Sequence, residues 1–340
     1  MRKILYTLLS VLSLVIVAIC NTPISVKAAE PIVIVIDPGH GGDNLGTDYL
    51  PIPEKDYNMI VAMYMKAYLE QYQNVKVYLT HTADISMSLK ERAQFAKNVG
   101  ADFLFSLHFN ASEDHSLYGA EVWIPSTGKA YSQGYSVGNE FLKEFQEMGI
   151  LNRGIKTKVG KTGNDYYGII RQCDLVNIPA IIVEHCYVDH AYDVINLQSN
   201  ETLREFGERD ARAVAKYFGL TSVDNQSSYA DYTPLAVPVP QSRMYQDATA
   251  PVYVNATLLN IDKSKHLASY SVTAADNETS LLYYSYSIDN GLTWSIYHPW
   301  SSANGAMTIS VNFPLNSQNS IIFKVLNQYD LATISNVVTF

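Results

Sequence analysis

The feature that most constrains this chain is the aliphatic run at residues 32–36, which breaks into the turn Asp37-Pro38-Gly39-His40-Gly41-Gly42. A continuous β-branched run bounded by proline and glycine predicts a strand buried on both faces, as in a largely parallel sheet. Open α/β sheets bind ligands at the carboxyl ends of their strands. We therefore expect His40 at that edge, although a lone loop histidine is more often an ordinary surface residue.

Two further apolar runs also carry ionisable side chains at their ends. Residues 102–110 contain His108, and residues 178–184 end in Glu184. Ionisable groups are costly in apolar strands and are usually placed there for chemistry, so this convergence predicts an enzyme. Pro53 and Glu54 open a helical pattern, which would direct Glu54 towards the same edge. The alternative is a surface acid that only stabilises the helix dipole.

The first 28 residues read as a secretory signal peptide. Arg2 and Lys3 precede an apolar stretch, and small residues around Ala28 form a cleavage pattern. An uncleaved membrane anchor is the competing interpretation. A lipoprotein modified at Cys20 is less favoured, because bulky Ile19 stands where a small residue is expected. We expect a protein that is secreted, extracellular or associated with the cell wall.

Charge and cysteine content narrow the partners and the redox chemistry. The net charge of −9 gives no general attraction to nucleic acid, so nucleic acid is not an expected partner. Any binding to an anionic envelope must use specific contacts. Beyond the signal peptide only Cys173 and Cys186 remain, which is too few for a disulfide framework. One bridge between them is an alternative to two reduced thiols, which we favour.

Strand and helix patterns alternate over residues 29–220. A capping box at residues 88–91 starts one helix, and Ser199 and Gly219 bound another. This alternation predicts an α/β domain, a three-layer open sheet with helices on both faces. The polar, glycine-rich segment 153–168 is expected to be a loop over the site.

The composition changes after residue 220. Residues 221–250 are rich in proline and small polar residues with little periodicity, which predicts a linker. Residues 251–340 contain short alternating β runs and no helical period, which predicts a small all-β sandwich of immunoglobulin-like type. Within it, residues 287–294 match an Asp-box hairpin, with Asn290-Gly291 at the turn and Trp294 packing back on it.

With these residues in hand, residues 31–220 resemble the zinc-dependent N-acetylmuramoyl-L-alanine amidases of the amidase-3 type, a family of peptidoglycan hydrolases. The similarity is carried by an ordered set of short motifs. They are residues 36–42, Glu54, Arg92, Asn98, Asp102, residues 106–111, Asn152-Arg153-Gly154, Pro179 and Val183-Glu184.

The resemblance implies a zinc ion held by His40, Glu54 and His108, and a catalytic carboxylate at Glu184. Two histidines and one glutamate are an established ligand set for catalytic zinc. The activity implied is hydrolysis, by zinc-activated water, of the amide that joins N-acetylmuramic acid to L-alanine. Asn110, Arg92 and His185 are assigned to substrate binding or to the surroundings of the ligands.

The family commonly continues Gly-Phe-x-Ser-Asn after the catalytic glutamate, whereas this chain has His185-Cys186-Tyr187. His185 and Cys186 would lie near the metal, and we favour packing or loop roles for them because the ligand set is complete without them.

The expected partner is peptidoglycan, with a cell-wall or surface partner for the β domain, and the chain is expected to be monomeric.

Two rival functions remain open at this stage. One is another zinc hydrolase of the wall, either a peptidase or a deacetylase. The other is a catalytically inactive wall-binding protein, which the intact set of His40, Glu54, His108 and Glu184 argues against.

Overall fold

A computed structural model of the chain describes residues 30–49, 52–313 and 320–339. The predicted signal peptide lies outside these residues, as do the alternatives of an anchor or a lipidated Cys20. Within the described residues, no helix combines the length and the apolar character needed to cross a membrane.

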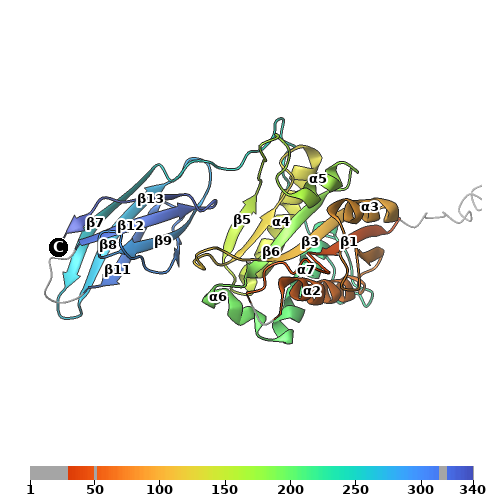
Figure 1. The fold of residues 1–340 in the computed structure, drawn as a ribbon, viewed down its shortest axis with the longest axis horizontal. Helices are drawn as coiled ribbons and strands as arrows, with labels where there is room; N and C mark the ends of the chain where they lie inside the picture. Colours follow the sequence, from red (N-terminus) through yellow and green to blue (C-terminus); the bar gives the residue numbers. More distant parts are fainter. Residues whose placement is uncertain (1–29, 50–51, 314–319, 340) are drawn as a thin grey trace, which may run out of the picture. The chain divides into compact units, whose positions relative to one another are not determined.

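The N-terminal region is built around a six-stranded sheet in the order β2-β1-β3-β6-β4-β5 (Figure 1). The strands are β1 (Ile32–Pro38), β2 (Val75–Leu79), β3 (Phe103–Asn110), β4 (Ala120–Trp123), β5 (Asn152–Lys156) and β6 (Ala180–Tyr187). Four neighbours, β2, β1, β3 and β6, run parallel.

The sheet is mixed, because β4 runs antiparallel to β6 and carries β5 parallel to itself. This differs from the largely parallel sheet that the sequence predicted. A parallel connection needs a crossover of a dozen or more residues. The chain between β3 and β4 is residues 111–119 and contains no helix, so β4 returns in the opposite direction.

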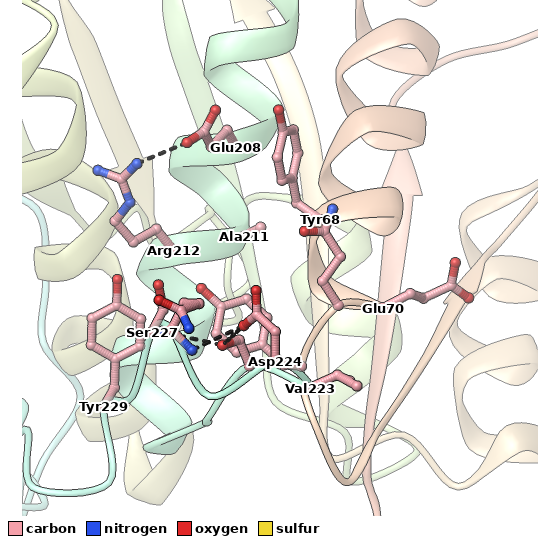
Figure 2. A pocket seen from close by; sticks show the side chains of 13 residues that line it. Tyr68, Glu70, Glu208, Ala211, Arg212, Val223, Asp224, Ser227 and Tyr229 are labelled. Carbon is pink, nitrogen blue, oxygen red and sulfur yellow. Dashed lines mark hydrogen bonds and ion pairs between the residues drawn. The ribbon is translucent and has the colours of Figure 1, made fainter.

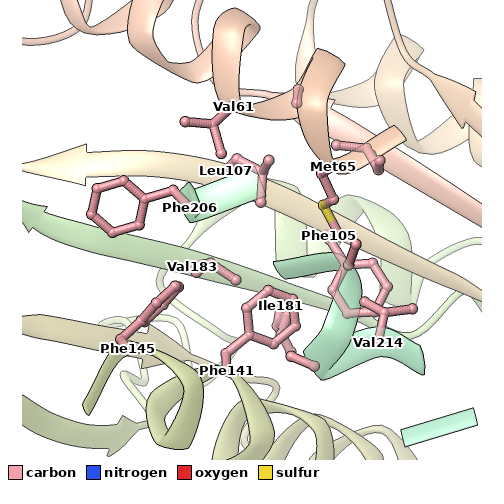
Figure 3. Packing of buried hydrophobic residues seen from close by; sticks show 14 of the residues in the cluster. Val61, Met65, Phe105, Leu107, Phe141, Phe145, Ile181, Val183, Phe206 and Val214 are labelled. Carbon is pink, nitrogen blue, oxygen red and sulfur yellow. The ribbon is translucent and has the colours of Figure 1, made fainter. Parts of the chain in front are cut away.

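Helices cover both faces of this sheet. They are α2 (Glu54–Leu69), α3 (Leu89–Val99), α4 (Gly128–Glu147), α5 (Gly168–Asp174), the short α6 (Ala191–Val194) and α7 (Asn200–Phe218). Phe105 and Leu107 of β3 pack with side chains of α2, α4 and α7 (Figure 3). Leu104, which points the other way, packs with α3 and α5. Successive side chains of β3 thus point to opposite faces of the sheet, and both faces are buried, as expected for a central strand.

The helix boundaries predicted from capping residues are confirmed. Ser88 accepts a hydrogen bond from the Glu91 backbone N–H while the Glu91 side chain bonds back, and α3 begins at the next residue. The Ser199 side chain caps α7, and Gly219, in the left-handed conformation with φ 66°, follows the last residue of the helix. Local side-chain chemistry fixed these ends, so they could be read from the sequence.

The prediction of a loop over residues 153–168 was wrong for the first part of this segment. Residues 152–156 form strand β5, which pairs with β4. Arg153 and Lys156 are buried there, 1% and 2% exposed, and both make ion pairs with Glu121 of β4. The strand can be buried without an apolar run because the charges of Arg153 and Lys156 are neutralised by Glu121 on the neighbouring strand.

The C-terminal region consists of two β-sheets, in the orders β11-β8-β7 and β10-β9-β12-β13, with β14 also paired to β12. Their strands are β7 (Tyr253–Asp262), β8 (Leu267–Ala275), β9 (Leu281–Ser287), β10 (His298–Pro299), β11 (Ala306–Asn312), β12 (Ser320–Asn327), β13 (Ala332–Ile334) and β14 (Val338–Thr339). Tyr270 of one sheet and Phe323 of the other belong to the same hydrophobic cluster. This region is all-β, as predicted.

The Asp-box segment forms the tight turn expected of it. Asn290 and Gly291 both have positive φ, 59° and 89°. Asp289 accepts hydrogen bonds from the Ser287 hydroxyl at 2.7 Å and the Thr293 backbone N–H at 2.9 Å. A Cβ at Gly291 would lie 3.6 Å from the Trp294 ring, so the indole packs against the turn.

The segment predicted as a linker lies along the N-terminal region. Pro238 accepts a hydrogen bond from the Ser132 hydroxyl at 2.9 Å, and the Met244 backbone N–H donates to the Ser126 carbonyl at 2.7 Å. Gln246 accepts from the Val159 backbone N–H at 2.8 Å. The segment contains no helix or strand between residues 221 and 252, apart from isolated bridges.

Candidate metal centre and active site

Three side chains from separate elements converge at the carboxyl edge of the sheet. His40 follows β1, His108 lies near the end of β3, and Glu54 is the first residue of α2. Glu54 Oε1 lies 3.1 Å from His40 Nε2 and 3.0 Å from His108 Nδ1. The ligand atoms of all three lie within 4.8 Å of one another. The sequence named these residues, and the fold brings them together.

Two glycines make room for this convergence. A Cβ at Gly39 would lie 2.2 Å from His108 Cε1, which is far inside van der Waals contact. A Cβ at Gly46 would lie 2.5 Å from Glu54 Oε2 and 2.7 Å from His40 Cδ2, and Gly46 also has φ 72°. At Gly46, only glycine permits both the close approach and the backbone conformation.

His40 itself has a left-handed backbone, with φ 67°. A non-glycine residue held in this region costs about 1–3 kcal/mol when the surroundings enforce it. Here Asn44 supplies part of the constraint, because its Oδ1 lies 3.0 Å from His40 Nδ1 and its backbone bridges Gly41. The strained turn directs the Nε2 atom of His40 to Glu54.

The Glu54 carboxylate is held from several sides and is only 4% exposed. It accepts hydrogen bonds from the backbone N–H groups of Thr47 at 2.9 Å and Phe109 at 3.1 Å, and from the Asn58 amide at 3.3 Å. Burial by itself raises its pKa, but hydrogen bonds to the His108 and His40 rings hold the pKa well below the usual range. Glu54 is therefore an ionised, fixed oxygen donor.

Arg92 lies beneath the glycine-rich turn, 4% exposed. Its guanidinium bonds Asp37 Oδ1 at 2.7 Å and the Pro38 carbonyl at 2.8 Å, and it also donates to the His40 carbonyl. Of the two roles considered for Arg92, these contacts favour support of the turn that carries His40.

Glu184 lies on β6 directly beside His108 in the parallel ladder. Its Oε2 atom is buried and has no hydrogen-bond partner among the described residues. Burial, followed by the charges of Glu54 and Glu121, raises the pKa of Glu184 well above its usual value. A carboxyl group with a raised pKa keeps its proton to a higher pH than an exposed carboxyl group does, and a pKa shifted in this direction is common in acid–base catalysts.

The structure adds a buried charge cluster that sequence reasoning missed. Glu121 Oε2 pairs with Arg153 Nε at 2.8 Å and Lys156 Nζ at 2.6 Å, and its Oε1 accepts from the Asn110 amide at 2.9 Å. Burial raises the pKa of Glu121, but the two cations lower it to about 2. The available signal was an acid inside the apolar segment 120–124. Asn110 thus contacts the cluster, two residues after His108.

Arg153 also contacts the C-terminal region. Its guanidinium lies 2.7 Å from Tyr283 Oη and 2.8 Å from Asp330 Oδ2. Tyr329 Oη bonds the backbone N–H of Thr157 at 2.9 Å, and the Gln328 amide donates to the Ile155 carbonyl at 2.7 Å. These contacts cover the free edge of β5, so the β region is joined to the cluster around Glu121.

His185 and Cys186 are both buried. His185 makes two hydrogen bonds, to the His108 carbonyl and to Asp210, each at 2.9 Å. Neither residue belongs to the group of converging ligand atoms. Cys173 and Cys186 are free thiols, which confirms the preference for two reduced cysteines over a bridge.

A separate pocket lies where α2 ends, lined by residues of α2, α7 and the segment 222–229. Figure 2 shows Tyr68, Arg212 and Tyr229 around it. Glu54 begins α2 and Tyr68 lies near its end, so this pocket is at the opposite end of the helix from Glu54 and the two histidines beside it. None of the predicted site residues lines it.

Comparison with known proteins places the chain in a family. Residues 34–216 match the family described as Amidase_3, N-acetylmuramoyl-L-alanine amidase. The match spans more than half of the chain, and the chain belongs to this family of peptidoglycan hydrolases.

Individual relatives agree with this assignment. The chain is 31% identical over 196 residues to the N-acetylmuramoyl-L-alanine amidase CwlM of Bacillus licheniformis, covering 55% of this chain and 69% of the relative. It is 26% identical over 200 residues to the sporulation-specific N-acetylmuramoyl-L-alanine amidase of Bacillus subtilis strain 168, covering 58% and 72%. Among solved structures, Cwp6 from Clostridium difficile superposes with a TM-score of 0.51 at 28% identity, over 58% of this chain and 30% of Cwp6.

Proposed function

We propose that this chain is a zinc-dependent amidase that cleaves the bond between N-acetylmuramic acid and L-alanine in peptidoglycan. The observation that carries the proposal is the meeting of His40, Glu54 and His108 beside Glu184 at one edge of the sheet. Family membership supplies the reaction, and this edge offers residues to perform it.

The donor set fits zinc. Two imidazoles and one ionised carboxylate form a three-ligand set that leaves a fourth position open, which is the usual arrangement of catalytic zinc. The cradle around Gly39 and Gly46 keeps the three donors close. When bound, zinc supplies a Lewis acid that polarises a carbonyl and lowers the pKa of water.

In this proposal Glu184 performs the proton transfers. Its carboxylate accepts a proton from the attacking water and then donates it to the nitrogen of L-alanine as the amide breaks. The raised pKa suits the group to both steps. The products are a free lactyl carboxylate on the sugar and a stem peptide with a free amino terminus.

Purified sacculi digested with the protein provide the test of function. We expect mass spectrometry to detect intact stem peptides that begin with free L-alanine, together with glycan that has lost its peptides. Fragments cut within the stem would indicate a peptidase, and released acetate would indicate a deacetylase. Sacculi that remain unchanged while the protein binds them would favour an inactive wall-binding protein.

For the C-terminal β region we propose an accessory role in binding the cell wall or a surface partner. It is an all-β region that lies beyond the residues matched by the family, and the four proposed zinc and acid–base residues lie upstream of it. Secretion by the signal peptide, a monomeric state and the division into residues 29–220, 221–250 and 251–340 are parts of the same proposal.

Removal of the β region should separate binding from chemistry. A chain that ends at Leu220 should hydrolyse soluble muropeptides but sediment less with insoluble walls than the full chain does. We expect it to melt at a lower temperature, because Arg153 loses its contacts with Tyr283 and Asp330. The measurements are turnover, wall sedimentation and thermal unfolding of both chains. Undiminished sedimentation would contradict the accessory role, and loss of all turnover by a folded truncated chain would make the region part of the enzyme.

A further inference from the structure

The ladder between β3 and β6 is irregular beside the proposed ligand His108. His108 lies opposite Glu184, but Asn110 lies opposite Tyr187. Two residues of β6, His185 and Cys186, therefore stand against the single residue Phe109. This is the arrangement of a β-bulge, a feature that is common next to active sites because it redirects side chains.

The His185 side chain bonds to the backbone at this irregular point. Its Nδ1 atom lies 2.9 Å from the backbone carbonyl oxygen of His108. A carbonyl can only accept, so Nδ1 carries the proton and donates it. The peptide carbonyl of a proposed metal ligand is thus held by a side chain of the bulge.

His185 is fixed in turn by helix α7. Its Nε2 atom lies 2.9 Å from Asp210 Oδ2, and both side chains are fully buried. The imidazole stacks on Phe109, with ring centroids 4.9 Å apart, and contacts Phe145 and Phe206 at 5.2 and 5.1 Å. Buried polar groups are costly unless they are bonded. Both ring nitrogens of His185 and the Oδ2 atom of Asp210 are bonded, which holds the imidazole in one orientation, whereas Asp210 Oδ1 has no hydrogen-bond partner among the described residues.

We infer that Asp210 and His185 are positioning residues that set the place of the His108 backbone, and hence the affinity and geometry of the metal site. Asp210 orients His185, and His185 holds the carbonyl from which the His108 ring projects. The inference rests on the proposed zinc site. It assigns to α7 a function beyond its packing against the sheet.

The test compares variants of the full-length protein that remove or retain this hydrogen-bond chain. His185→Phe and Asp210→Leu remove it. Asp210→Asn retains it, since the amide can donate to Nε2 while Nδ1 still donates to the His108 carbonyl. Val214→Ala is the matched control, because Val214 is a buried residue one turn further along α7 that contributes only apolar packing.

The measurements are the zinc dissociation constant, by competition with a chromophoric chelator, and the visible absorption spectrum of the cobalt-substituted protein. Loss of a group that hydrogen-bonds to a metal ligand typically costs about 10–100-fold in metal affinity or activity. We expect His185→Phe and Asp210→Leu to weaken zinc binding by about tenfold or more, and to alter the cobalt spectrum. Asp210→Asn and Val214→Ala should stay close to wild type in both measurements.

Equal zinc affinity in Asp210→Leu and Asp210→Asn would overturn the inference. The inference would also be overturned if Val214→Ala and His185→Phe both lost zinc affinity in proportion to their loss of thermal stability. The His185–Asp210 pair would then act through stability alone. The two Asp210 variants decide the matter even if His185→Phe does not fold. A wild-type protein that binds zinc yet releases no stem peptide would contradict the proposed function and leave this comparison intact.

Discussion

Glu184→Gln should lower turnover by about 10²–10⁴-fold while zinc content and melting temperature stay near wild type. Glutamine is nearly isosteric with glutamate, but it cannot accept a proton from water or return one to the leaving nitrogen. Glu184 Oε2 makes no hydrogen bond among the described residues, so the substitution breaks no contact of that atom. Steady-state kinetics on a soluble muropeptide, elemental analysis and thermal unfolding are the measurements.

Glu113→Gln is the matched control, because it makes the same chemical change at an exposed residue of the loop that follows β3. Glu113→Gln should leave turnover unchanged.

The pH profile of the wild-type protein adds a second check. A general base must be deprotonated, so wild-type kcat/KM should fall as the pH drops through the raised pKa of Glu184. That limb should be lost in Glu184→Gln. A variant that arrives without metal would show that Glu184 is a ligand, and the roles of Glu54 and Glu184 would have to be exchanged.

His108→Ala should remove the metal and the activity together. The substitution deletes one of three donors and leaves Glu54 without the ring that lies 3.0 Å from its Oε1. Two donors fall short of the three protein ligands that usually hold catalytic zinc. Elemental analysis of the purified variant, together with turnover measured in added zinc, checks this result.

His298→Ala serves as the control for His108→Ala. His298 belongs to β10 in the C-terminal region and stacks on Tyr284 with ring centroids 5.0 Å apart. It should retain one zinc per chain and full turnover. If His108→Ala keeps stoichiometric zinc, the assignment of the ligands is wrong.

The converging residues could be predicted because strand ends share an edge. His40, His108 and Glu184 each follow or end an apolar run, and parallel strands bring their carboxyl ends to one side of a sheet. For Glu54 the helix start predicted only that the side chain is directed towards the same edge, with a surface acid as the alternative, and its place among the ligands was implied by the resemblance to the amidase-3 family. The strand ends and the helix start are properties of local sequence and simple topology, and neither depends on the packing of distant side chains.

The cluster around Glu121 could not be predicted in the same way. Arg153 and Lys156 lie in a segment without an apolar period, and their burial depends on Glu121, which is 32 positions before Arg153 in the sequence. The bulge opposite Phe109 was hidden for a related reason. The sequence drew attention to His185 beside Glu184, but its bonds depend on the register of two strands and on Asp210 of a later helix.

The left-handed backbone of His40 has a consequence for engineering this chain. Residues in that conformation are natural targets for stabilisation, since glycine adopts it without the steric cost that a side chain carries. A design that maximises thermal stability alone would therefore replace His40 first among the residues of the turn. The more stable protein would have lost a proposed metal ligand, so selection for heat resistance and selection for wall hydrolysis act against each other at this single position.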